Sequence, residues 1–230
     1  CTPISQAARG WWSWSERMAE APGPALLPAG DAAAIDEAAA AMQVGGIVGI
    51  PTETVYGIAV VPRPEALKAV IAAKGRPEDK GIALLIDGLD QVDGLVAVSD
   101  PARALAARYW PGALTLVLPL TRPELVPDLL SGGRATLGLR IPDHAVPRTL
   151  ARLLGPIAVT SANRSGEPAA TTAAELVESV GHSLALVLDD GPVRGGVAST
   201  VVSVDAGGRW QVLREGALDQ ERIRLAVEGA

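Results

Sequence analysis

The sequence predicts an α/β fold, in which a single domain holds a twisted mixed sheet flanked by helices. Short apolar runs rich in β-branched residues alternate with helical segments along most of the chain. Two of the runs, 200–204 and 211–213, follow each other directly, which favours a mixed sheet over a purely parallel one. With 230 residues and 48% hydrophobic content, the chain is long enough to bury one sizeable core.

The first thirty residues differ in composition from the rest. Three tryptophans lie within residues 11–14, and prolines follow at positions 22, 24 and 28. We predict that residues 1–30 form a flexible or loosely docked extension and that the domain spans residues 31–230. The tryptophan cluster is either a partner contact or without a function, and the sequence leaves both readings open.

From Asp31 onward the predicted helices and strands alternate. Asp31 can cap a helix that runs to about Met42, and Pro64 suits the first turn of a helix that ends at Gly75. Further helices are predicted at 99–110, 145–154, 172–180 and 218–228. Strands are predicted at 46–50, 82–86, 114–118, 135–141, 157–160, 184–188, 200–204 and 211–213. The stretch 119–134, rich in proline and glycine, is the longest irregular one and a candidate flap.

Composition limits the classes of function and location. The net charge of −6 argues against a broad nucleic-acid-binding face, because such faces carry clustered positive charge. One cysteine excludes an internal disulfide, and two histidines form no zinc-type cluster, so no protein metal site is predicted. No apolar run is long enough to span a membrane, and no signal-type segment opens the sequence. We therefore expect a cytoplasmic protein that does not contact membranes.

The most informative segment is the heptapeptide 51–57, Pro-Thr-Glu-Thr-Val-Tyr-Gly, which follows an apolar run at 46–50. Pro51 has no backbone N–H, so the strand should end there. Two threonines, a glutamate and a tyrosine then lie at the carboxyl end of that strand. Ligands bind at this end of the strands in open α/β sheets, so the heptapeptide is predicted to form part of a binding site.

A second polar segment, 74–81, concentrates cations between glycines. Lys74, Arg76 and Lys80 lie in a loop with Gly75 and Gly81, which allow close approach of a ligand to the backbone. Such cations are suited to polyphosphate oxygens. The alternative for Lys74 is a structural one, in which its charge interacts with the dipole of the preceding helix.

Four further polar segments follow or begin predicted strands. Alternation in the strand 135–141 places Thr136, Gly138 and Arg140 on one face. Arg140 is interpreted either as a bidentate ligand of a carboxylate or phosphate, or as a partner in an internal salt bridge. The other segments carry Ser161 and Asn163, which bind a ligand or cap a turn, then Ser199, and finally Arg214. The chain has no P-loop, no Gly-x-Gly-x-x-Gly fingerprint and no Gly-x-Ser-x-Gly elbow.

Seven blocks between residues 45 and 216 together resemble one known family. They read PTETVYG, KGRPEDKG, WPGALTLVL, ATLGLRIPDH, TSANRSGEP, ASTVVSV and LREG. In this order they resemble the YrdC-domain family, the L-threonylcarbamoyladenylate synthases. The resemblance implies a YrdC-like fold and a reaction in which L-threonine, bicarbonate and ATP give L-threonylcarbamoyladenylate and pyrophosphate. The product would serve the machinery that modifies the tRNA adenosine next to the anticodon.

The resemblance also implies roles for individual residues. Thr54, Arg140 and Ser199 would contact L-threonine, whereas Arg76, Lys80, Thr136, Ser161 and Arg214 would contact ATP. Lys74, Arg76, Ser161 and Asn163 match the family's Lys-x-Arg and Ser-x-Asn signatures and are expected to support catalysis. Mg²⁺ is expected to arrive with the nucleotide. No general base is assigned, and Glu53 is either a proton acceptor or a structural residue.

Two other functions are compatible with the same fold. One is an RNA-binding module without turnover, which would bind RNA weakly given the acidic balance. The other is a related enzyme that handles a different carbamoyl adenylate. Release of pyrophosphate that requires both L-threonine and bicarbonate separates the synthase from these alternatives.

Overall fold

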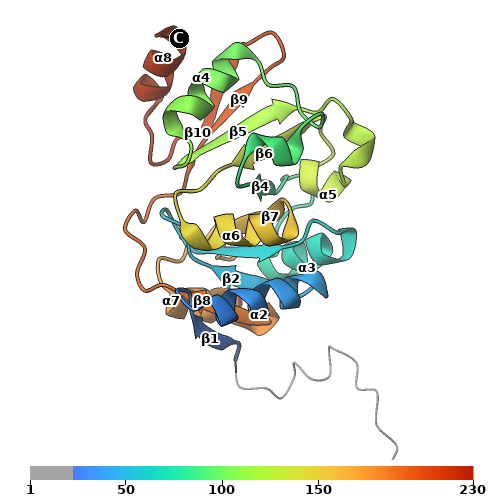
Figure 1. Ribbon diagram of the computed structural model, residues 1–230, viewed down its shortest axis with the longest axis vertical. Helices are drawn as coiled ribbons and strands as arrows, with labels where there is room; N and C mark the ends of the chain where they lie inside the picture. Colours follow the sequence, from blue (N-terminus) through green and yellow to red (C-terminus); the bar gives the residue numbers. More distant parts are fainter. Residues whose placement is uncertain (1–22, 230) are drawn as a thin grey trace, which may run out of the picture.

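A single mixed sheet of ten strands organises the computed structural model, which describes residues 23–229 (Figure 1). The strands are β1 (Ala25–Pro28), β2 (Val48–Ile50), β3 (Gly57–Val60), β4 (Ala83–Leu85), β5 (Leu114–Pro119), β6 (Thr136–Arg140), β7 (Ile157–Ser161), β8 (Leu186–Asp189), β9 (Thr200–Val204) and β10 (Trp210–Arg214). Their order is β1-β8-β2-β3-β7-β4-β6-β5-β9-β10, with both parallel and antiparallel neighbours. The predicted mixed sheet is therefore confirmed.

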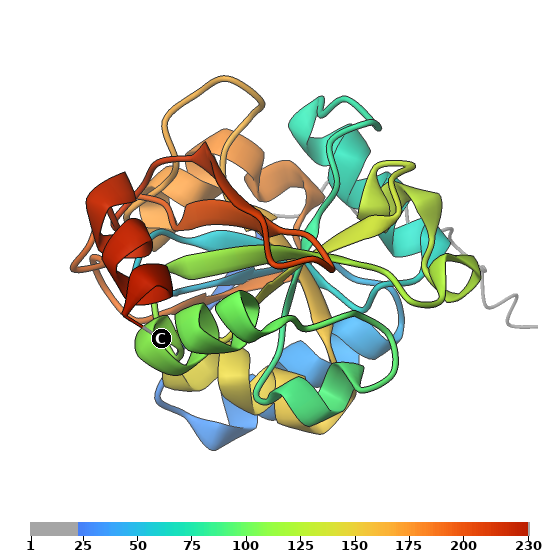
Figure 2. The same ribbon diagram turned by 90° about the horizontal axis from the view of Figure 1, so that it is seen from above.

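Helices lie on both sides of this sheet (Figure 2). The α-helices are α2 (Ala32–Gln43), α3 (Pro64–Lys74), α4 (Asp100–Tyr109), α5 (Asp128–Ser131), α6 (Ala145–Leu154), α7 (Ala173–Val180) and α8 (Gln220–Glu228). Short 3₁₀ turns occur at Leu89–Val92, Pro123–Leu125 and Gly181–Ser183. None of the helices in the described part of the chain has the length and apolar character needed to cross a bilayer.

The two faces of the central strands pack against different helices. Ala59 of β3 belongs to a core cluster with buried residues of α2 and α6, whereas its neighbours Ile58 and Val60 belong to a cluster with residues of α3 and α7. This alternation follows from the two-residue period of a strand, because successive side chains point to opposite faces. Strands buried on both faces read as continuous apolar runs, as 57–60 does.

The predicted helix boundaries agree with the structure. The side chain of Asp31 accepts a hydrogen bond from the backbone N–H of Ala33 at 3.0 Å and so caps α2. Pro64 begins α3, and Gly75 ends it in the left-handed conformation with φ of 58°. The helices predicted at 99–110, 145–154, 172–180 and 218–228 correspond to α4, α6, α7 and α8.

The structure differs from the sequence prediction in three places. β1 lies inside the range 1–30, and its parallel pairing with β8 makes residues 25–28 part of the sheet rather than of an extension. β3 was not predicted and forms an antiparallel pair with β2 on one side and β7 on the other. The stretch 119–134 contains a 3₁₀ turn and α5, so it is not wholly irregular. The tryptophan cluster lies outside the described residues.

Candidate active site

A cavity of about 700 Å³ lies over one face of the sheet. Alternate residues of three neighbouring strands form its floor, namely Thr115 and Val117 of β5, Thr136, Gly138 and Arg140 of β6, and Val201 and Ser203 of β9. The walls come from loops that contain the heptapeptide 51–57 and the segments 76–81 and 130–134. The predicted common face of Thr136, Gly138 and Arg140 is confirmed by their shared position in this floor.

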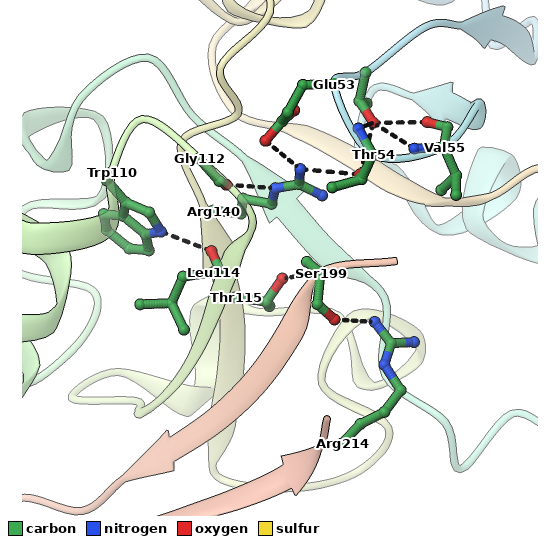
Figure 3. Close-up of polar contacts among 11 residues, drawn as sticks. Glu53, Thr54, Val55, Trp110, Gly112, Leu114, Thr115, Arg140, Ser199 and Arg214 are labelled. Atoms are coloured by element: carbon green, nitrogen blue, oxygen red, sulfur yellow. Dashed lines mark hydrogen bonds and ion pairs between the residues drawn. The ribbon is translucent and has the colours of Figure 1, made fainter. Parts of the chain in front are cut away.

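Arg140 is held on three sides at the edge of the cavity (Figure 3). Its Nε donates to the carbonyl of Gly112 at 3.0 Å, and its Nη2 donates to Glu53 Oε1 at 2.6 Å and to Thr54 Oγ1 at 3.0 Å. The side chain of Arg140 is 7% exposed and that of Glu53 is 23% exposed, so their contact is a partly buried ion pair. The internal salt bridge considered for Arg140 is therefore present, while the residue also faces the cavity.

The shape of the heptapeptide depends on the buried hydroxyl of Thr52. Its Oγ1 donates to the carbonyl of Val55 at 2.6 Å and accepts from the backbone N–H groups of Thr54 and Val55 at 3.2 Å. It also lies 2.9 Å from Thr54 Oγ1. A threonine that bonds its own following turn in this way fixes local backbone geometry, so Thr54 is presented to Arg140 in one orientation.

The loop that follows β8 packs directly over the heptapeptide. Tyr56 is fully buried, and its hydroxyl donates to the carbonyl of Gly191 at 2.8 Å and accepts from the N–H of Asp190 at 3.1 Å. Burial, followed by the nearby carboxylates, raises the pKa of Tyr56 to about 12. A Cβ atom on Gly195 would come within 2.7 Å of the Glu53 carbonyl oxygen, so only glycine allows this close approach. The loop then leads to Ser199, whose Oγ lies 2.8 Å from Thr115 Oγ1.

Three further guanidinium groups line the cavity without a carboxylate partner within 4 Å among residues 23–229. Arg76 donates to the carbonyls of Lys80 and Gly81, Arg134 to the carbonyl of Asp79, and Arg214 to the carbonyl of Ser199. Burial lowers the pKa of Arg76 and the charge of Arg214 lowers it further, while the charge of Asp79 acts in the opposite direction. The pKa of Arg214 is lowered by burial and then by the charge of Arg140. Unneutralised cations that repel one another favour the binding of a polyanion.

Lys74 lies behind the cavity rather than on its lining. Its residue exposure is 3%, and its ammonium group donates to the carbonyls of Ser161 and Asn163 and to Asn163 Oδ1. Burial, together with the charge of Arg76, lowers the pKa of Lys74 to about 8. Asn163 in turn accepts from Ser161 Oγ at 2.5 Å and donates to the carbonyl of Glu167 at 2.6 Å. Lys74 and Asn163 therefore hold the turn that presents Ser161 to the cavity.

The structure brings together most of the predicted site residues. Those on the cavity lining are Arg76, Thr136, Arg140, Ser161, Ser199 and Arg214, and Thr54 contacts the lining through Arg140. Lys80 is exposed at the outer end of the 76–81 loop and is not on the lining. Sequence reasoning did not select Arg134 or Thr115. Strand alternation with Val117 was a usable signal for Thr115, whereas Arg134 follows two glycines in a stretch interpreted as a flap.

The cavity is suited to anionic ligands rather than to a protein-bound metal. Within the described residues, no group of three or more potential ligands from histidine, cysteine, aspartate and glutamate is close enough to hold a metal ion. In the described part of the chain, the lining carries hydroxyls and guanidinium groups but no carboxylate. A hard cation such as Mg²⁺ prefers several oxygen ligands, which in this cavity would come mainly from a phosphate ligand itself.

Comparison with known proteins identifies the family. The model of a family described as "Telomere recombination", the Sua5/YciO/YrdC domain, matches residues 40–216. The chain is 37% identical to a threonylcarbamoyl-AMP synthase of Bacillus subtilis, with 84% of this chain and 56% of the relative covered. It is 39% identical to a putative threonylcarbamoyl-AMP synthase of Mycobacterium tuberculosis, with 85% of this chain and 91% of the relative covered.

Solved structures agree with this assignment. The crystal structure of Pyrococcus abyssi Sua5 complexed with L-threonine has a TM-score of 0.78 and 37% identity, covering 84% of this chain and 56% of that chain. Escherichia coli YciO, at 23% identity and a TM-score of 0.72, shares the fold. The chain thus spans a little over half the length of its Bacillus and Pyrococcus relatives. On the family match and these identities, the chain belongs to the Sua5/YciO/YrdC family.

Proposed function

We propose that this chain synthesises L-threonylcarbamoyladenylate from L-threonine, bicarbonate and ATP, with release of pyrophosphate. The proposal rests on one cavity. In it Arg76, Arg134 and Arg214 have no carboxylate partner among residues 23–229, and a fourth arginine, Arg140, lies next to them among hydroxyls. Such a cavity suits a nucleoside triphosphate beside a small hydroxylated carboxylate. The names of the relatives support the same reaction.

In this proposal, the two substrates occupy neighbouring parts of the cavity. Arg76 and Arg214 hold the phosphates of ATP together with the hydroxyls of Thr136 and Ser161, and exposed Lys80 adds a cation at the rim. Arg140 binds the carboxylate of L-threonine, with Thr54 and Ser199 beside it. Lys74 and Asn163 act indirectly, because their hydrogen bonds fix the turn that carries Ser161.

The proposed chemistry needs positioning and charge more than a covalent nucleophile. The threonine amine and carbon dioxide from bicarbonate form a carbamate, and a carbamate oxygen then forms a bond to the α-phosphorus of ATP. The bond between the α-phosphorus and the bridging oxygen breaks, and pyrophosphate leaves with that oxygen. Both steps bring anions together, so fixed guanidinium groups can lower the barrier by orienting the reactants and stabilising charge. Mg²⁺, carried by the nucleotide, would supply further charge neutralisation when bound.

The product and the place of reaction follow from the same proposal. L-Threonylcarbamoyladenylate is a mixed anhydride, so it needs an acyl acceptor, which we take to be the tRNA threonylcarbamoyl-transfer machinery in the cytoplasm. An RNA-binding module without turnover fits less well, because the net charge is −6 and the guanidinium groups of Arg76, Arg134 and Arg214 line a cavity.

The test is pyrophosphate release from ATP with each component withheld in turn. Release should require L-threonine and bicarbonate together, and the adenylate should be detectable by mass spectrometry. The variant Arg214→Gln should lower release strongly, whereas Arg209→Gln, an exposed arginine paired with Asp205 outside the cavity, should not. Release that proceeds without L-threonine or without bicarbonate would overturn the proposed function.

A further inference from the structure

Glu53 is an acidic residue whose two carboxylate oxygens have different environments. Oε1 accepts a hydrogen bond from Arg140 Nη2 at 2.6 Å. Oε2 is buried and has no hydrogen-bond partner among the described residues. A buried carboxylate oxygen without a donor is unfavourable, because it has lost its water and gained nothing in return. The side chain as a whole is 23% exposed, so it lies at the edge of the site rather than in the closed core.

Glu53 supplies a carboxylate next to the cavity, whereas the described residues of the lining supply none. A free amino acid carries an ammonium group beside its carboxylate, and the lining formed by residues 23–229 has guanidinium groups but no carboxylate. Among the residues that the structure describes, two carboxylates contact lining side chains, Glu53 through Arg140 and Asp189 through the Tyr56 hydroxyl. Oδ1 of Asp189 already accepts from the N–H of Gly191 at 2.9 Å and lies 3.2 Å from the Tyr56 hydroxyl, whereas Oε2 of Glu53 has no hydrogen-bond partner within residues 23–229.

Within the described residues, Arg140 has one hydrogen-bond donor without a partner, and Glu53 has one acceptor without a partner. Nε and Nη2 of Arg140 are engaged with Gly112, Glu53 and Thr54, which leaves Nη1 without a partner among residues 23–229. Nη1 can donate to a carboxylate. Oε2 is buried, so the Glu53 side chain has to move before that oxygen can accept from an ammonium group in the cavity. The ion pair keeps Glu53 next to Arg140, as recognition of a zwitterion requires.

We propose that Glu53 binds the α-ammonium group of the amino-acid substrate through Oε2 and accepts its proton before the carbamate forms. The inference rests on the proposed function. The N–H bond breaks as an O–H bond forms on Oε2, which leaves a neutral amine and a neutral Glu53. The amine lone pair then forms the N–C bond to carbon dioxide, one C=O π pair moves onto oxygen, and the second N–H proton leaves to water.

The test compares two ligands on two proteins. L-Threonine and (R)-3-hydroxybutanoate share the carboxylate, hydroxyl and methyl groups, but only L-threonine has the ammonium group. Isothermal titration should show that the unaltered protein prefers L-threonine by about tenfold or more. Glu53→Gln keeps an oxygen for Arg140 but places an amide N–H₂ near the ammonium. This variant should lose most of the preference while its affinity for 3-hydroxybutanoate stays within about twofold.

The outcomes separate the inference from the proposed function. If Glu53 only orients Arg140, then Glu53→Gln will weaken both ligands by the same factor, and the inference is wrong while the proposed function stands. If the unaltered protein binds both ligands equally well, the ammonium group is not recognised and the inference also fails. If it binds neither ligand, the proposed function fails with it. Glu65→Gln, at an exposed position in the first turn of α3, is the matched control and should change neither affinity.

The proton-transfer part has its own readout. At saturating L-threonine, Glu53→Gln should lower kcat, and the loss should shrink as the pH is raised. The reason is that the amine then becomes neutral without a protein base. A loss of kcat that is constant with pH would restrict Glu53 to binding.

Discussion

Replacing Lys74 with methionine removes a buried ammonium group while keeping an unbranched side chain of similar length. The ammonium donates to three oxygens of the turn that carries Ser161 and Asn163. Burial and the charge of Arg76 lower the pKa of Lys74 from 10.5 to about 8 in the folded protein. The free energy of unfolding should therefore depend on pH in the unaltered protein in a way that Lys74→Met cannot reproduce.

The sign and size of this dependence follow from proton linkage. Below pH 8, Lys74 is protonated in both the folded and unfolded states, and the folded state bears the full cost of a buried charge. Between pH 8 and 10.5, only the unfolded state keeps the proton, so stability increases as the pH rises. At about 1.4 kcal/mol per tenfold change in proton affinity, the gain reaches about 3 kcal/mol by pH 10.5.

The assay is guanidinium-induced unfolding from pH 7 to 10.5, with the stability of Lys74→Met subtracted from that of the unaltered protein at each pH. Subtraction removes groups common to both proteins, including Tyr56, whose pKa is raised to about 12. The difference should move by about 3 kcal/mol in favour of the unaltered protein as the pH rises, at constant m-value. The matched control is Lys68→Met, which alters an exposed lysine of the same helix and should give a flat difference.

A flat difference for Lys74→Met would refute the reasoning, because it would mean that the folded protein leaves the pKa of Lys74 at its ordinary value. A difference that moves in the opposite direction would mean that the turn oxygens outweigh the burial of the charge.

Three other variants test the cavity and its supports. Arg140→Lys should raise the KM for L-threonine at least about tenfold more than it raises the KM for ATP. The reason is that a lysine ammonium cannot make the three hydrogen bonds of Arg140 and also donate to a ligand. Equal effects on both KM values would contradict the assigned role. Arg134→Gln should raise the KM for ATP about tenfold with little change for L-threonine, while exposed Arg122→Gln is silent in the same kinetic assay. Thr52→Val keeps the shape of the side chain but removes the hydroxyl that bonds three backbone groups. Denaturant unfolding should therefore show that the free energy of unfolding falls by about 2–4 kcal/mol. A fall below about 0.5 kcal/mol would show that the turn does not need the hydroxyl.

Local patterns were sufficient to predict the parts of the fold and site that depend on nearby residues. The cap at Asp31 and the left-handed glycine at Gly75 act within a few residues of their own positions. Similarly, the face shared by Thr136 and Arg140 follows from strand alternation alone. These predictions required no knowledge of which segments meet in the folded chain.

The parts that the sequence did not reveal depend on distant segments. Lys74 ends a helix next to a glycine-rich loop, and its contact with the turn at 161–163 becomes apparent only when these two distant segments are placed together. β3 is only four residues long and becomes recognisable as a strand through its pairing with β2 and β7. Arg134 gains its position because the loop at 132 packs against the loop at 79–81, where a Cβ on Gly132 would lie 2.5 Å from the Asp79 carbonyl oxygen.

The strand order has a consequence for the synthesis of the chain on the ribosome. β2 and β3 flank the heptapeptide, yet their outer neighbours are β8 and β7, and β7 begins at Ile157. Nearly a hundred residues must therefore be translated after Val60 before β3 can gain its second partner, and at about 5–20 residues per second this takes roughly 5–20 s. During that interval the nascent hairpin has open edges and unburied apolar residues such as Ile58. The segment that forms one wall of the cavity is thus translated well before the strands that cover its hairpin on either side.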